Sequence, residues 1–434
     1  MTTSAPITER RYGTPLLLVT TLFFLWALGV NLNDVLIPHL KKVFDLNDFQ
    51  SALIQVAFFG GYCLSALPAG RLLERIGYKN GIVIGLLTCA MGALLFIPAA
   101  SIQVYGLFLF ASFVMACGQG VLEVAANPYV TLLGPVESSE RRLNLAQSFN
   151  AVGAVVTPFI GSAFILSALE YSREKLTTMT PAEMAAYRTA VISTVRMPYL
   201  VIAGIFLAYA VVIFLSKLPE VGATNGAVEE STREELRDIW RYGHLVKGVI
   251  AQFFYVGAQV GVASFVIRLA QHSTPGMLQK DASFYLKLHL IGFMIGRFSG
   301  SYIMKRVPAA RLLALFSLST LVCLLVVLLG SGAAPLWAVV LIGFFHSIMF
   351  PTIFALSIKQ LGRYTKLGSS LLVASIIGGA IFPAIMGFIS DHSTIRVAFI
   401  VPLICQAYVL YFAVRGYRPV LVAGSQAAEL STAK

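Results

Sequence analysis

Apolar residues occur along this 434-residue chain in long runs that are separated by short polar breaks. Twelve of these runs come close to or exceed the roughly 20 apolar residues that an α-helix needs to cross a bilayer. The pattern therefore predicts an all-α membrane protein with twelve transmembrane helices. Their approximate spans are 15–40, 49–72, 80–99, 103–130, 142–168, 196–217, 246–270, 283–304, 310–330, 335–359, 367–389 and 395–415.

One long polar stretch divides these runs into six and six. We predict an N-terminal six-helix bundle over 1–217, a cytoplasmic central loop over 218–245 and a C-terminal six-helix bundle over 246–434. The halves repeat weakly, since glycine and proline recur at matching places in the fifth and eleventh runs. Parallel six-helix halves of this kind are a transporter architecture. A second polar break contains a short predicted surface helix at 181–187.

Composition agrees with a membrane protein, because 57% of the residues are hydrophobic and only 12% are charged. A soluble domain carries about 25% charged residues. The net charge of +12 is assigned to cytoplasmic loops rich in Lys and Arg rather than to nucleic-acid binding. The weight of these charges places both termini in the cytoplasm, although the loops after the first and fifth runs are exceptions. We expect a multi-pass protein of the cell inner membrane.

Two carboxylates stand inside apolar runs, Asp34 in the first and Glu123 in the fourth. A charged group at the centre of a membrane helix costs about 2.5–3.5 kcal/mol on insertion scales. Such groups face a protein interior and commonly serve proton relays. Burial favours the protonated form of a carboxyl group, so each acid could load and release a proton. Hydrogen bonding to a neighbouring helix is the alternative interpretation.

Amides accompany these acids at helical spacing. Asn31 shares a face with Asp34, and Asn127 shares a face with Glu123. Amides and carboxylates offer donors and acceptors for hydroxyl groups, so a neutral polyol such as a sugar is the expected ligand. The fifth run adds three amides, and the first two runs add aromatic rings as candidate faces for a sugar ring: Asn144, Gln147 and Asn150; Phe23, Phe24, Trp26, Phe58, Phe59 and Tyr62.

The second half is less acidic inside its runs. Gln252 and Gln259 are seven residues apart and share a helix face near Tyr255. Two histidines and one lysine also lie inside apolar runs: His289, His346 and Lys287. Histidines on apolar helices are more often satisfied packing residues than functional groups. The second half therefore contributes Gln259 as its candidate ligand residue.

The connection between the second and third runs contains five residues that we predict to form a cytoplasmic gate: Gly70, Glu74, Arg75, Gly77 and Lys79. This stretch resembles the signature loop of the major facilitator superfamily, in which the acid is usually Asp. A degraded copy follows in the second half from Gly296 and Arg297 to Arg306. Anchoring of the loop by positive charge is the simpler alternative.

Three further motifs make the chain similar to the fucose–galactose–glucose:proton symporter family: 31–34 Asn-Leu-Asn-Asp, 120–128 Gly-Val-Leu-Glu-Val-Ala-Ala-Asn-Pro, and 142–150 Arg-Leu-Asn-Leu-Ala-Gln-Ser-Phe-Asn. The resemblance covers nearly the whole chain except the termini and the central loop. It implies sugar binding at the midplane between two bundles. It also implies that Asp34 and Glu123 are the essential acidic pair for proton coupling and sugar binding, with Asn31 and Gln147 near the sugar.

Departures from the fucose-transporting members lie around the expected sugar site. Val30 replaces one of two adjacent asparagines, and Lys287 and His289 replace small or uncharged residues. A small segment at 261–263 replaces a bulkier one. These differences leave glucose, galactose or N-acetylglucosamine open beside L-fucose.

We therefore predict a proton-coupled importer of a monosaccharide that works by alternating access. The predicted substrate-binding residues are Asn31, Asp34, Glu123, Gln147, Asn150, Gln259 and Trp26. No cofactor or metal is expected, because the proton is the coupling ion, and the protein is expected to be a monomer in the lipid bilayer. A facilitator or an exporter of the same fold is the alternative. A membrane-embedded enzyme is disfavoured, since no set of catalytic groups is recognisable.

Overall fold

The computed structural model describes residues 10–44, 46, 48–164, 179–220, 237–274 and 276–419. These described residues are helical and contain no strand. The helices of the first half of the sequence are α1 (Gly13–Val43), α2 (Asp48–Ile102), α3 (Tyr105–Leu132), α4 (Ser139–Phe164), α6 (Pro181–Ser193) and α7 (Arg196–Leu215). Those of the second half are α9 (Gly243–Ser273), α10 (Gln279–Ile303), α11 (Ala309–Leu329), α12 (Ala334–His346), α13 (Met349–Ser357), α14 (Thr365–Ala374), α15 (Gly378–His392) and α16 (Ile400–Tyr411). Short helical turns are η1 (Arg10–Tyr12), η2 (Val136–Ser138), η3 (Gly362–Tyr364), η4 (Ser375–Ile377), η5 (Val397–Phe399) and η6 (Phe412–Gly416).

Within the described residues, helical residues coincide with every predicted membrane span, although the breaks differ from the prediction. Residues 165–168 of the predicted fifth span lie outside the described residues. Spans 49–72 and 80–99 both lie in α2, which is interrupted by non-helical dihedral angles at Gly77. Span 335–359 is divided into α12 and α13, and span 367–389 into α14, η4 and α15. Among the described residues, nine helical stretches are long and apolar enough to cross a membrane, and one of them covers 50 residues.

A helix is present at the predicted position 181–187 and continues to Ser193 as α6, while its surface location stays a prediction. Its first turn is fixed by a capping box in which the Glu183 amide donates to Thr180 Oγ1 at 3.3 Å. The Thr180 amide donates in return to Glu183 Oε2 at 2.8 Å. Two amides that would lack partners at a helix start are thereby satisfied.

The described chain divides into two compact units. The N-terminal unit comprises Arg10–Ala126 and Leu145–Pro219, and the C-terminal unit comprises Asn127–Asn144 and the described part of Glu220–Lys434. The end of α3 and the start of α4 thus belong to the C-terminal unit. The predicted division at 1–217, 218–245 and 246–434 stays a prediction.

Small residues let the helices of the N-terminal unit approach closely. A Cβ atom on Gly61 of α2 would lie 2.7 Å from the Phe113 carbonyl oxygen of α3. A Cβ on Gly118 of α3 would lie 2.5 Å from the Cys89 amide nitrogen of α2. Membrane helices commonly pack through small residues of this kind, because lipid supplies no hydrophobic driving force. These contacts fix α2 against α3 on both sides of its break.

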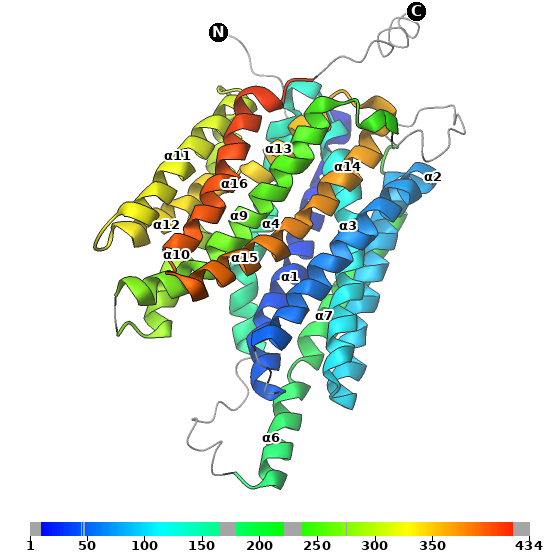
Figure 1. Cartoon of the computed structure of the whole chain (residues 1–434). Helices are drawn as coiled ribbons and strands as arrows, with labels where there is room; N and C mark the ends of the chain where they lie inside the picture. Colours follow the sequence, from blue (N-terminus) through cyan, green and yellow to red (C-terminus); the bar gives the residue numbers. More distant parts are fainter. Residues whose placement is uncertain are drawn as a thin grey trace, which may run out of the picture. The chain divides into compact units, whose positions relative to one another are not determined.

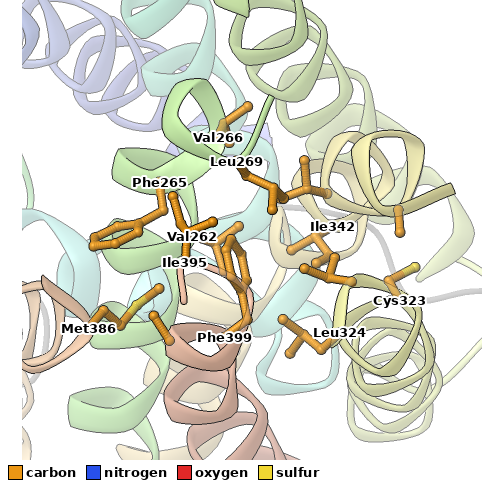
Figure 2. Close-up of a cluster of buried hydrophobic side chains, with 14 of the residues drawn as sticks. Val262, Phe265, Val266, Leu269, Cys323, Leu324, Ile342, Met386, Ile395 and Phe399 are labelled. Atoms are coloured by element: carbon orange, nitrogen blue, oxygen red, sulfur yellow. The ribbon is translucent and has the colours of Figure 1, made fainter. Parts of the chain in front are cut away.

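The C-terminal unit is built around α9, which packs against α10, α12, α13, α15 and α16 (Figure 1). Its apolar core joins Val262 and Leu269 of α9 to Ile342 of α12 and Leu324 of α11. Phe399 and Met386 close this core from the last helices (Figure 2). Large apolar side chains also cover the outer faces, as Leu329 at 82% exposure illustrates. Helices that are apolar all round are typical of membrane spans.

Candidate functional site

Both predicted acids lie in the N-terminal unit. Glu123 is in α3 and is only 5% exposed. Asp34 is in α1, and its side chain lies outside what the structure describes. Asn31, one turn before Asp34, is half-buried and donates from Nδ2 to the Ala27 carbonyl at 2.7 Å. This bond uses one of the two N–H donors of the amide, whose other N–H and carbonyl oxygen are the groups that could bind a hydroxyl.

A chain of buried hydrogen bonds connects three helices beside Glu123. Trp26 Nε1 on α1 donates to the Tyr62 hydroxyl on α2 at 3.2 Å. The Tyr62 hydroxyl donates to Gln119 Oε1 on α3, also at 3.2 Å. Gln119 is fully buried and stands one turn before Glu123 on the same helix face. The chain thus holds α1 and α2 against the part of α3 that carries the acid.

From the sequence, Tyr62 is expected only as an aromatic face, and Gln119 is not among the predicted site residues. The structure gives both a polar role, because the Tyr62 hydroxyl joins Trp26 to Gln119. The Tyr62 hydroxyl also lies near Glu123. A signal for Gln119 was available in its spacing of four residues from Glu123. No sequence pattern indicates that Tyr62 would reach it from another helix.

The amides of α4 approach α1 within the same unit. Asn150 Nδ2 donates to the Phe23 carbonyl at 3.3 Å, and Gln147, one turn earlier, is 3% exposed. Gly153 allows this approach, since its Cβ would lie 2.8 Å from the Phe24 carbonyl oxygen. Asn150 is therefore held against α1, the helix that carries Trp26 and Asn31. Gln259, the seventh predicted ligand residue, is half-buried on α9 in the C-terminal unit.

The predicted gate motif coincides with the break in α2. Gly77 has φ +77° and ψ 172°, a conformation that is essentially restricted to glycine. Gly70 is buried before the break, whereas Glu74 and Arg75 are exposed. Lys79 follows the break with its Nζ 5.8 Å from the centre of the Phe214 ring. The second glycine of the motif thus makes the turn between the two spans.

The start of α4, which belongs to the C-terminal unit, carries a second group of polar contacts. Lys359 Nζ lies 2.9 Å from Glu140 Oε1, with the two side chains 30% and 7% exposed. Asn144 Nδ2 donates to Thr352 Oγ1 at 3.0 Å. Sequence analysis grouped Asn144 with Gln147 and Asn150 by spacing, but the structure places Asn144 in the other unit.

Apolar spans interrupted by buried polar side chains define a multi-span membrane protein with an internal polar site. Comparison with known proteins supplies its family. The Major Facilitator Superfamily profile matches residues 19–373, and the chain belongs to this superfamily.

Relatives of high similarity are sugar transporters. The chain is 43% identical over 409 residues to the glucose/galactose transporter of Brucella abortus, covering 94% of this chain and 95% of the relative. It is 42% identical over 409 residues to the L-fucose-proton symporter of Escherichia coli, covering 93% of each chain. The crystal structure of the transporter FucP in the outward conformation matches with a TM-score of 0.87 and 42% identity, covering 93% of this chain and 99% of FucP. The expected superfamily and fold are confirmed.

Proposed function

We propose that this protein is a proton-coupled symporter that imports a monosaccharide by alternating access. The observation that carries the proposal is the burial of Glu123 beside the Trp26–Tyr62–Gln119 chain. The likeness to two named sugar transporters over more than nine-tenths of the chain supports the substrate class.

Proton coupling follows from the position of the acid. Removal of a carboxylate from water disfavours its charged form, so Glu123 binds a proton when it is enclosed. Contact with water on one side of the membrane then stabilises the carboxylate and releases the proton. We assign this role to Glu123 together with Asp34, and at least one of the two also contacts sugar hydroxyls.

Neutral hydrogen-bonding groups suit an uncharged sugar. Amides bind hydroxyl groups as donors and acceptors without attracting a charged ligand. We assign sugar binding to Asn31, Gln147, Asn150 and Gln259, with Trp26 as an aromatic surface against the sugar ring. L-fucose, glucose and galactose are the candidate substrates, in line with the relatives' names.

Gating is assigned to the motif around the α2 break, from Gly70 through Glu74, Arg75 and Gly77 to Lys79. We further propose that both termini lie in the cytoplasm, that the protein resides in the inner membrane and that it works as a monomer without a cofactor. A facilitator of the same fold is the alternative, and it would exchange sugar without accumulating it.

Sugar added to lightly buffered cells that express the protein tests the proposal. A symporter alkalinises the medium as it takes up sugar, whereas a facilitator leaves the external pH constant. A panel of L-fucose, galactose, glucose, mannose and N-acetylglucosamine identifies the substrate. Glu137→Gln is the matched control for acid variants, since Glu137 is exposed. Failure of every sugar to change the pH, with uptake intact, would contradict symport.

A further inference from the structure

The helix at 334–357 is interrupted inside the C-terminal unit. α12 ends at His346 and α13 begins at Met349. The Ser347 amide donates to the Phe344 carbonyl at 3.4 Å, three residues back, whereas an α-helix bonds four residues back. Irregular backbone at membrane depth is tolerated where neighbouring groups satisfy it. The interruption therefore has to be explained by what surrounds it.

Side chains from two neighbouring helices satisfy the carbonyl groups at the break. The Tyr255 hydroxyl of α9 donates to the His346 carbonyl at 2.8 Å. Arg297 Nε of α10 donates to the Ser347 carbonyl at 3.1 Å. Gly296 lets α10 pass close to this point, since a Cβ there would clash with Ser347 Oγ. The backbone of the break is thus held by protein groups.

The polar side chains at the break are different. Both amide atoms of Gln252 have no hydrogen-bond partner within the described residues. The ring nitrogens of His346 and the Oε1 of Gln406 make no hydrogen bond of standard geometry there, although Gln406 lies within reach of the imidazole. All three residues are 0% exposed. Gln406 does use its Nε2, which contacts Ser317 Oγ at 3.0 Å and Met349 Sδ at 3.2 Å.

Contacts between the helices place Tyr255, His346 and Gln406 together. The His346 and Tyr255 rings meet edge to face, with 5.7 Å between their centroids, and Gln406 approaches the imidazole of His346. Gln252 precedes Tyr255 by about one turn and follows Gly248, whose Cβ would clash with Ser357 of α13. Gln252 therefore faces α13 from α9, on the side where Tyr255 meets His346.

Buried polar atoms without a well-formed hydrogen bond are costly, at about 1–3 kcal/mol for each. Buried water relieves this penalty elsewhere in proteins, with about three hydrogen bonds for each molecule. Water matches the requirement here because amide and imidazole groups need both donors and acceptors. A cation is disfavoured by the adjacent guanidinium of Arg297.

We propose that the break between α12 and α13 binds a small cluster of ordered water molecules held by Gln252, His346 and Gln406. The cluster makes this interruption a hydrated joint, distinct from the dry apolar core of the same unit. This inference does not depend on the substrate or on proton coupling, because it rests on groups outside the proposed transport site.

Radiolytic hydroxyl-radical labelling of the purified protein in lipid nanodiscs tests the proposal. Ordered water generates radicals beside buried side chains, so Met349 at the joint should oxidise quickly although it is 0% exposed. Met386 is the matched control, since it is equally buried but lies in the apolar core (Figure 2). We expect oxidation of Met349 to be about tenfold faster than that of Met386, because bridging water lies beside only one of them. Equal, slow oxidation of both would overturn the proposal.

A stability measurement provides a second, independent test. Gln252→Leu keeps the side-chain size and removes both unpartnered amide atoms. In a dry site this change relieves a penalty and raises the midpoint of thermal unfolding, whereas in a hydrated site it removes water-mediated bonds and lowers the midpoint. We expect a lower midpoint together with slower Met349 oxidation. A higher midpoint with unchanged labelling would contradict bound water.

Discussion

Buried charge has different surroundings in the two units. In the C-terminal unit, the guanidinium of Arg142 is 0% exposed and donates to the carbonyl groups of Val130, Thr131 and Pro135 and to Ser138 Oγ. In the N-terminal unit, Glu123 is a buried carboxylate with the Tyr62 phenol nearby and Gln119 one turn away on the same helix.

The difference shows that burial alone does not identify a functional charge. Arg142 caps carbonyl groups at the end of α3, where the helix leaves acceptors unsatisfied. Arg297 serves the α12–α13 break in the same way. Both arginines are thus explained by backbone that needs donors. A charged carboxylate cannot donate to carbonyl groups, so this explanation does not extend to Glu123, for which we propose proton binding.

Glu123→Gln is expected to have the largest effect. Glutamine keeps the size and polarity of the side chain but cannot bind and release a proton. We expect loss of uphill sugar accumulation by about two orders of magnitude or more, as for removal of a transferring acid. Uptake of labelled sugar into energised cells is the measurement. Exchange of sugar across the membrane of preloaded vesicles should persist. Full sugar accumulation by the variant would contradict the assignment.

Arg142→Leu should act on stability rather than on coupling. The change leaves several buried carbonyl groups without donors, at a cost of about 1–3 kcal/mol for each. We expect a large fall in the midpoint of thermal unfolding in detergent. Arg142→Lys is the matched variant, since it restores one donor and should recover part of the loss. An unchanged midpoint for Arg142→Leu would mean that Arg142 does not stabilise the fold, and its contrast with the proton-binding role proposed for Glu123 would fail.

The sequence is sufficient to predict the membrane spans because a continuous apolar run has one stable arrangement in lipid. It also indicates Glu123, because an acid in such a run is costly. It does not predict the Trp26–Tyr62–Gln119 chain, which depends on how three helices rotate against one another. Nor does the sequence indicate that Asn144 and Gln147 fall in different units, because both lie on α4 at regular helical spacing.

Gly77→Ala tests whether the motif at the α2 break is structural. Alanine at φ +77° and ψ 172° is strained by about 1–3 kcal/mol. We expect a correspondingly lower unfolding midpoint. Gly204→Ala is the control, because it lies in α7 of the same unit and its Cβ would meet no atom within 4 Å. If both variants were equally stable, the turn would not require glycine.

The smallest effect is expected at the ion pair between Lys359 and Glu140, where one partner is 30% exposed. Solvent screens such pairs, so the coupling between the two side chains should be about 1 kcal/mol or less. Unfolding midpoints of Lys359→Met, Glu140→Gln and the double variant give this coupling. Lys359→Met alone should cost more than the double variant, because it leaves the 7% exposed carboxylate of Glu140 without its cation. If Lys359→Met and the double variant lost equal stability, the buried acid would not need Lys359. Glu140 would then resemble Glu123 more than Arg142.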